Sequence, residues 1–246
     1  MEVLFLKFEL SNPATLKTVV DGLSVIVDEC GISFNEDKVS INALSKDHTT
    51  FMMVELEKYL FDEYEADNSM VIVDVNELQK IMKRCKNTDI VVGSVDEANL
   101  NLTFKGDSTR SFNTRLIDND YESPRPPMID YPCNLEIPTS VLNDSLGDLR
   151  IFSDVLNLAV DNDYILFKGD GQSGEGLIKY LHGEHIQNYF KSQYSIEKLS
   201  EIMKAKDFSE SVTVGLGDDL PLHLTFKLVT GDGRIEFLLA PRISDA

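Results

Sequence analysis

The chain repeats part of its own sequence about half-way along its 246 residues. LQKIMK at 78–83 matches LSEIMK at 199–204 at an offset of 121, and LNLTFK at 100–105 matches LHLTFK at 222–227 at an offset of 122. These offsets are close to half of the chain and far longer than the roughly 20–50 residues of solenoid repeats. The repeat therefore predicts a duplicated domain.

The start of each half shows the same pattern with different residues. GISFNEDKVSIN at 31–42 and LNLAVDNDYILF from 156 each predict a strand, an Asn/Asp-rich turn and a second strand, at an offset of about 126. Most other segments alternate with period two, as strands do. We therefore expect each copy to contain several antiparallel strands.

Two helices are expected in each copy. In the first copy, Asn12 can cap a helix with Pro13 at its first position, and ELQKIMKRCK at 77–86 places Leu78, Ile81, Met82 and Cys85 on one face. In the second copy, helices are predicted from Pro138-Thr139 and from Ser195. The predicted fold class is α+β, a duplicated domain with antiparallel sheets packed against two helices per copy.

A proline-rich segment separates the copies. DNDYESPRPPMIDYP at 118–132 holds four of the chain's eight prolines, so it should run extended over a surface. The expected organisation is an N-terminal domain at 1–117, a connector at 118–132 and a C-terminal domain at 133–246. Met128 and Ile129 are apolar for an exposed connector, so they either anchor it or form one wall of a groove.

The charge is strongly negative, yet the helix at 77–86 is basic. The chain has 42 acidic and 23 basic residues and a formal net charge of -19. Lys80, Lys83 and Arg84 share one side of that helix, with Lys86 on the flank. They form either a solvated face near a helix C-terminus or a local surface for an anion. The net charge argues against an ordinary DNA-binding domain.

Few signals of other protein classes are present. No apolar run approaches the roughly 18 residues of a membrane span, and no signal peptide is visible, which favours an intracellular protein. The three cysteines form no CxxC pair and are expected to be reduced thiols. His182 and His185 in HGEH lack a third ligand, so no metal site is predicted.

One glycine motif offers an alternative function. Gly169-x-Gly171-x-x-Gly174 fits a dinucleotide fingerprint, which would make the chain a nucleotide-binding enzyme. The residues that follow alternate as a strand and provide no helix N-terminus for a pyrophosphate, so a hairpin loop is favoured. We therefore expect no cofactor and no catalytic residue.

Three motifs carry a resemblance to a known family. Leu239-Ala240-Pro241-Arg242, Leu116-Ile117-Asp118 and the helix LQKIMKRCK at 78–86 make the chain resemble the sliding clamp family of proliferating cell nuclear antigen, over nearly its whole length. The resemblance implies a ring of three head-to-tail subunits, with sheets outside and helices lining the hole. It implies a DNA sliding clamp, a non-enzymatic processivity factor for DNA polymerase that a clamp loader opens.

The resemblance also implies roles for charged residues. The residues expected to face the DNA phosphates are Lys17, Lys80, Lys83, Arg150, Lys204 and Lys206. Such contacts carry no sequence information and weaken with salt. At the subunit boundary, the matching ion pairs join Arg84, Lys86 and Arg110 to Asp144 and Asp148, beside pairing of strand 109–116 with strand 174–181 of a neighbour.

Partner proteins of the family dock a short peptide under the connector. The pocket residues implied by position are Leu44, His48, Met128, Ile129, Pro221, Phe237, Leu238, Ala240 and Pro241. The expected partners are double-stranded DNA, DNA polymerase, the clamp loader, flap endonuclease and DNA ligase. Leu44-Ser45 replaces the Met-Asp usual in the family, which leaves the peptide preference open. The sequence also leaves open a paralogue that works only in a heterotrimer, and a location in the cytoplasm or nucleoid of an archaeon or the nucleus of a eukaryote.

Overall fold

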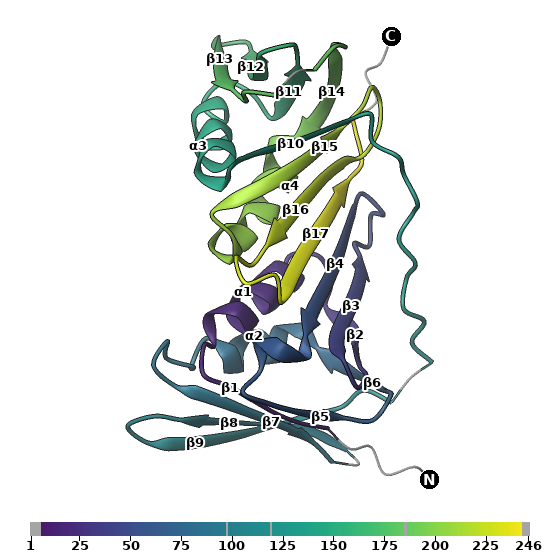
Figure 1. Cartoon of the computed structure of the whole chain (residues 1–246), viewed down its shortest axis with the longest axis vertical. Helices are drawn as coiled ribbons and strands as arrows, with labels where there is room; N and C mark the ends of the chain where they lie inside the picture. The colour runs from purple at the N-terminus through teal and green to yellow at the C-terminus, as the bar shows by residue number, and fades with distance from the viewer. Residues whose placement is uncertain (1–5, 97, 119, 185, 243–246) are drawn as a thin grey trace. The chain divides into compact units, whose positions relative to one another are not determined.

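A computed structural model describes residues 6–96, 98–118, 120–184 and 186–242 (Figure 1). The chain divides into two compact units. Unit 1 consists of Met1–Lys46, Met52–Pro126 and Leu228–Ile235, and unit 2 of Asp47–Phe51, Pro127–Lys227 and Glu236–Ala246. Each unit thus contains a short segment from the other half of the sequence. Within the described residues, no helix is both long enough and apolar enough to span a membrane.

The elements of the first half alternate between strands and two helices. They are β1 (Leu6–Leu10), α1 (Ala14–Leu23), β2 (Glu29–Phe34), β3 (Lys38–Leu44), β4 (Thr50–Glu57), the 3-10 helix η1 (Lys58–Leu60), β5 (Glu63–Ala66), β6 (Ser69–Asp74), α2 (Val75–Met82), β7 (Ile90–Val95), β8 (Asn99–Lys105) and β9 (Thr109–Arg115). One sheet has the order β5-β1-β7-β8-β9, and the other strands are arranged as β4-β3-β2-β6.

The elements of the second half follow the same succession. They are β10 (Cys133–Pro138), α3 (Thr139–Leu149), β11 (Val155–Val160), β12 (Tyr164–Gly171), β13 (Gly174–Leu181), β14 (Phe190–Ser195), α4 (Ile196–Ile202), the 3-10 helix η2 (Met203–Phe208), β15 (Ser211–Leu216), β16 (Leu222–Lys227) and β17 (Gly233–Leu239). Their strands are arranged as β13-β12-β11-β14 and as β10-β15-β16-β17.

The strand orders confirm the predicted duplication. The order β4-β3-β2-β6 recurs as β13-β12-β11-β14, and β1-β7-β8-β9 recurs as β10-β15-β16-β17. Even a turn is repeated at an offset of 126: Asn35 Oδ1 accepts from the N–H groups of Asp37 and Lys38, and Asp161 Oδ1 accepts from those of Asp163 and Tyr164. Such Asx turns fix the hairpin between the two strands. The α+β prediction is confirmed.

The predicted helices form, with small differences at their ends. α1 begins at Ala14, whose N–H donates to Asn12 Oδ1 at 3.2 Å. α2 ends at Met82, earlier than the predicted stretch, because the N–H of Cys85 donates to the Met82 carbonyl in a tighter turn at 3.1 Å. Cys85 stays buried although it lies beyond the helix.

The glycine motif at 169–174 forms a hairpin. Gly171 pairs with Gly174 across a two-residue turn that joins β12 to β13. The chain continues directly into a strand, so no helix N-terminus is available at this loop to hold a pyrophosphate. The nucleotide-binding alternative therefore lacks the local structure on which it depended.

Candidate nucleic-acid interface

The helices of unit 1 lie side by side and present two lysines outward. Gln79 Nε2 on α2 donates to Asp21 Oδ1 and to Ser24 Oγ, each at 2.8 Å, which joins the helix to α1 and the turn after it. Lys80 and Lys83 follow on the exposed side of α2. Lys83 Nζ lies 3.0 Å from Gln79 Oε1, one helical turn away. The Lys83 ammonium group is therefore held against α2, and both lysine side chains are exposed.

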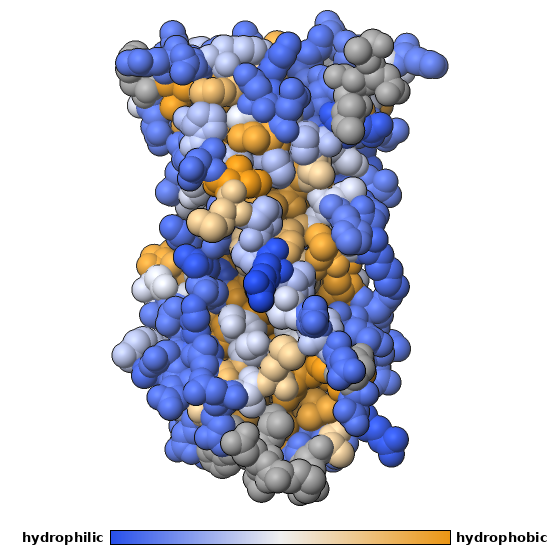
Figure 2. All heavy atoms as spheres, turned by 90° about the vertical axis from the view of Figure 1, so that its right-hand side faces the viewer, coloured by the Kyte–Doolittle hydropathy of each residue, from blue (hydrophilic) through white to orange (hydrophobic). Residues whose placement is uncertain are grey.

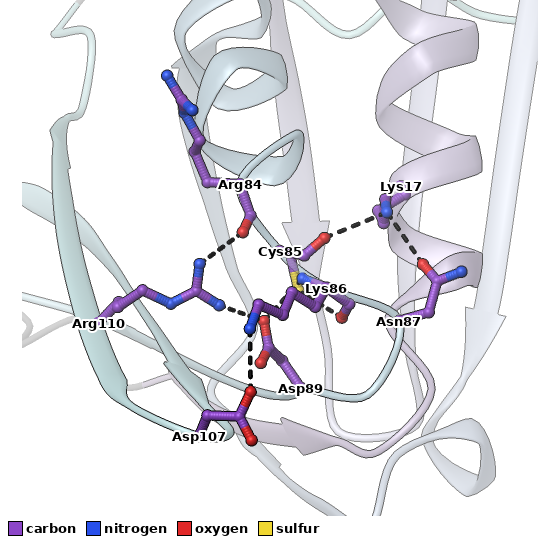
Figure 3. Close-up of polar contacts among 8 residues, drawn as sticks. All are labelled: Lys17, Arg84, Cys85, Lys86, Asn87, Asp89, Asp107 and Arg110. Atoms are coloured by element: carbon purple, nitrogen blue, oxygen red, sulfur yellow. Dashed lines mark hydrogen bonds and ion pairs between the residues drawn. The ribbon is translucent and has the colours of Figure 1, made fainter.

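Lys17 has a structural role in addition to its charge. Its Nζ donates to the Cys85 carbonyl at 3.2 Å and to Asn87 Oδ1 at 3.0 Å (Figure 3). These bonds tie α1 to the segment that follows α2. A cation at this place also matches the partial negative charge at the end of α2.

Unit 2 carries its cations on the corresponding elements. Arg150 follows α3 as its C-cap, and Lys204 and Lys206 lie on η2 directly after α4. All three side chains are exposed. Lys204 is the counterpart of Lys83 at the offset of 121, so both copies keep a lysine at this position.

These six cations share one property. Among the described residues, no carboxylate forms an ion pair with Lys17, Lys80, Lys83, Arg150, Lys204 or Lys206. Strand lysines of unit 1 do pair, as Lys7 does with Glu63 at 2.8 Å and Lys105 with Glu9 at 2.9 Å. Lys198 of α4, in contrast, pairs with Asp47 at 3.1 Å. In a chain of net charge -19, these six cations, and not every cation on the helices, therefore stay available to another anion.

A polar network follows α2 (Figure 3). Arg110 on β9 donates through Nη1 to the Arg84 carbonyl at 2.7 Å and through Nη2 to the buried carboxylate of Asp89. Asp89 also accepts from the Lys86 N–H at 2.7 Å. That backbone hydrogen bond and the Arg110 charge lower the pKa of Asp89. Sequence reasoning missed Asp89, because a lone Asp before a strand carries no distinctive pattern.

Some of the residues predicted to form the subunit interface already form ion pairs within the described part of the chain, and others do not. Lys86 Nζ lies 3.0 Å from Asp107 Oδ2, and Arg110 is engaged by Asp89. The Arg84 side chain points away from Arg110 in Figure 3 and has no ion pair in the described part of the chain. Asp144 and Asp148 are exposed on α3. β9 and β13 each end a sheet order and so have an edge without a neighbouring strand in the described residues.

The residues predicted to line the peptide pocket differ in exposure. Met128 is fully exposed, and His48 is exposed with a left-handed backbone at φ 57°. Leu44, Ile129, Pro221, Ala240 and Pro241 are partly exposed. Phe237 is fully buried and packs edge-on against Phe226 at 6.1 Å between ring centroids. It is a core residue, because alternation along β17 turns its side chain inward.

Apolar surface is present but divided. On the face shown in Figure 2, hydrophilic residues predominate and apolar residues form separate patches among them.

In the described residues, no group of three or more His, Cys, Asp or Glu side chains could hold a metal ion. His185 of the HGEH motif lies outside the described residues.

The fold and its helical cations define a class of protein: two tandem copies of one α+β domain, with cations that have no ion pair in the described residues on or next to the helices of an acidic chain. Residues 5–123 match the family model described as proliferating cell nuclear antigen, N-terminal domain, and residues 126–242 match its C-terminal domain. The chain belongs to the proliferating cell nuclear antigen family, as the sequence motifs predicted.

Named relatives agree. The chain is 44% identical over 238 residues to the DNA polymerase sliding clamp of Methanobrevibacter smithii, covering 96% of this chain and 98% of that protein. It is equally similar to the DNA polymerase sliding clamp of Methanothermobacter thermautotrophicus, at 44% identity and the same coverage. The DNA polymerase sliding clamp of Pyrococcus furiosus is 29% identical over 236 residues, with 92% and 94% covered.

Proposed function

We propose that this protein is a DNA sliding clamp, a ring that encircles duplex DNA and tethers DNA polymerase as a processivity factor. The family and the names of its relatives support the proposal. Its role is to hold catalytic partners on DNA and not to catalyse a reaction. It acts inside the cell, where the genomic DNA is.

The observation that carries the proposal is the set of unpaired cations on the helical elements. Lys80, Lys83 and Lys204 have no ion pair within the described residues, although acidic residues outnumber basic ones by 42 to 23. Lysine and arginine contacts to phosphates give affinity without sequence preference. A ring that slides needs contacts of this kind. The acidic remainder would repel DNA elsewhere on the surface.

The proposed ring is a homotrimer of two-domain subunits, with domains 1–117 and 133–246 joined by the connector 118–132. The free edges of β9 and β13 support strand pairing between subunits. Arg84 and the exposed Asp144 and Asp148 supply an ion pair across the boundary. An exposed pair contributes about 0–1 kcal/mol, so the strand pairing would dominate closure.

Partner proteins would bind through a short peptide near the connector. Met128 and Ile129 supply apolar surface on one side, and Ala240 and Pro241 directly follow β17. Because Phe237 and Leu238 are both buried, the pocket would use Ala240 and Pro241 and not these two side chains. DNA polymerase, the clamp loader, flap endonuclease and DNA ligase are the proposed partners.

The function is tested by charge reversal on the proposed DNA-facing surface. The double variant Lys80→Glu, Lys83→Glu should shorten the products that a polymerase makes per binding event on primed circular DNA, because the helical surface then repels phosphates. The matched control is Lys227→Glu, which changes an exposed lysine of β16 that has no ion pair in the described part of the chain. Equal product lengths for wild type and the double variant would refute the proposed role of α2.

Assembly is tested by mass. Light scattering of the purified chain should give three times the subunit mass of 27.7 kDa. A persistent monomer at micromolar concentration would refute a homotrimer and favour the heterotrimer alternative.

A further inference from the structure

One sheet face occurs in both copies, but within the described residues it is covered by a side chain of the chain itself only in unit 1. In unit 1, the ring of Tyr121 lies directly over Gly31 of β2, where an added Cβ would be 2.7 Å from Tyr121 Cε1. The Tyr121 hydroxyl donates to the Asn42 carbonyl of β3 at 3.4 Å. The chain thus covers this face of unit 1 with its own aromatic side chain.

The same face of unit 2 is open. At the offset of 126 set by the matching turns, Asn157 replaces Gly31 and Lys168 replaces Asn42. Both residues line a cleft of about 390 Å³, together with Ala159, Leu166 and Tyr189. Tyr189 is 57% exposed, so it contributes accessible apolar surface.

The strand register places cations on both sides of an apolar floor. Ala159 of β11 lies opposite Leu166 of β12 and opposite Lys191 of β14, and Leu166 lies opposite Lys179 of β13. Residues directly opposite on one sheet face are close neighbours. The row across the four strands is therefore Lys191, Ala159, Leu166, Lys179, with two small or aliphatic side chains between two ammonium groups.

The cleft is lined by both basic and acidic residues. Lys168, Lys191 and Arg242 line it, against two acids, Asp170 and Asp219. Lys168 pairs with Glu175 at 2.9 Å. In the ranges that the structure describes, the side chains of Lys191 and Arg242 have no ion pair, and both are exposed. Because Lys168 is paired with Glu175 and Asp170, the positive charge available at the cleft comes from Lys191 and Arg242.

The occupant of the equivalent face in unit 1 indicates the chemistry that fits. Tyr121 belongs to the segment DNDYES, where Asp118, Asp120 and Glu122 surround it in the sequence. We propose that the cleft of unit 2 binds an acidic segment of a partner protein that carries a tyrosine or phenylalanine. The aromatic ring lies on Ala159 and Leu166, and the carboxylates pair with Lys191 and Arg242. None of the cleft residues is among those assigned to the peptide pocket, and Arg242 directly follows Pro241 of that pocket.

The test uses a fluorescein-labelled heptapeptide, Asp-Asn-Asp-Tyr-Glu-Ser-Pro, and the full-length protein. Fluorescence anisotropy should show saturable binding, because the peptide reproduces the segment that covers unit 1. Lys191→Glu should weaken binding about fivefold, the size of one exposed ion pair. Ala159→Phe fills the cleft and should weaken it more, with the fold checked by circular dichroism. Lys227→Glu, the matched charge change outside the cleft, should leave binding unchanged.

Peptide variants and competitors separate the alternatives. Replacing the tyrosine by alanine, or the three acids by their amides, should each weaken binding. Methyl NMR signals of Ala159 and Leu166 should shift on addition of the parent peptide. The proposal is overturned if no saturation is reached at roughly millimolar peptide, a range that corresponds to about -4 kcal/mol. Two competitors are oligothymidylate and an excess of the unlabelled chain. The proposal is also overturned if either one displaces the peptide from the wild-type protein and from Lys191→Glu to the same extent, because the peptide would then occupy a surface for DNA or for a second copy of the chain.

Discussion

The two copies share a backbone and a core but differ on their surfaces. Phe104 of β8 and Phe226 of β16 are counterparts at an offset of 122, and both are fully buried. Gly31 and Asn157 are counterparts too, yet one lies under a tyrosine and the other lines an open cleft. Duplication thus preserved the residues that fill the interior. The outer faces, where many side chains satisfy the backbone equally well, were free to acquire different partners.

The helices show the same division. LQKIMK and LSEIMK both form a helix, but α2 is followed by an irregular turn and α4 by the 3-10 helix η2. After α2, Arg110 and Asp89 hold the turn, whereas Ala205 and Phe208 of η2 are buried. The residues that follow each helix, and whether they are buried, therefore determine the structure in which the helix ends. Two helices with similar sequences can therefore be followed by different structures.

The largest effect should come from the matched core phenylalanines. Phe104→Ala and Phe226→Ala should each lower the free energy of unfolding by about 3–5 kcal/mol, since both remove a fully buried ring. Urea denaturation followed by circular dichroism measures this loss. Phe112→Ala, which removes a partly exposed ring 5.3 Å from Phe104, should cost less and serves as the control. A loss confined to one copy would show that the cores are not equivalent.

A smaller effect should separate the matched glycines Gly93 and Gly215. A Cβ on Gly93 would overlap the buried ring of Phe8, while one on Gly215 would lie 3.0 Å from His223 Cβ and 3.1 Å from Tyr131 Cγ. Gly93→Ala should therefore destabilise by about 1–3 kcal/mol, as overpacking does. Gly215→Ala should cost less, because His223 and Tyr131 are only partly buried. Equal shifts in the denaturation midpoint would contradict this ranking.

The smallest effect concerns the turn between β7 and β8. Asp96 accepts from Asn101 Nδ2 and from the N–H groups of Ala98 and Asn99, and these bonds, that of Asn101 most of all, lower its pKa to about 2. A depressed folded-state pKa gives stability that is present above the unfolded value of 3.8 and is lost as the pH falls to about 2.

Asp96→Asn should consequently lower the melting temperature at pH 7, and the difference from wild type should shrink between about pH 4 and about pH 2. Thermal melts across that range measure it. Asp218 is the counterpart of Asp96, but its carboxylate accepts from the Lys191 N–H on another strand. A constant difference at all pH values would show that the Asp96 charge does not contribute.

Much of the fold could be predicted because the sequence contains it twice. Repeated apolar spacing predicted the four helices, and Ser195 caps α4 as expected, with its hydroxyl accepting from the Lys198 N–H at 3.3 Å. The candidate site was predicted less completely. The charges of Lys80 and Lys83 could be seen in the sequence, but the links from Lys17 to Asn87 and from Arg110 to Asp89 join residues far apart in the chain. No local pattern marks such pairs.

The sequence by itself determined the duplication, the α+β class and the family, because these depend on periodicity and on motifs read along the chain. Only the tertiary structure decided which cations stay unpaired, that Phe237 is buried, and that short segments of each half join the opposite unit. Ion pairing and burial depend on side chains brought together from distant strands. The hydrophobic periodicity and the composition of the sequence do not specify which side chains become neighbours in this way.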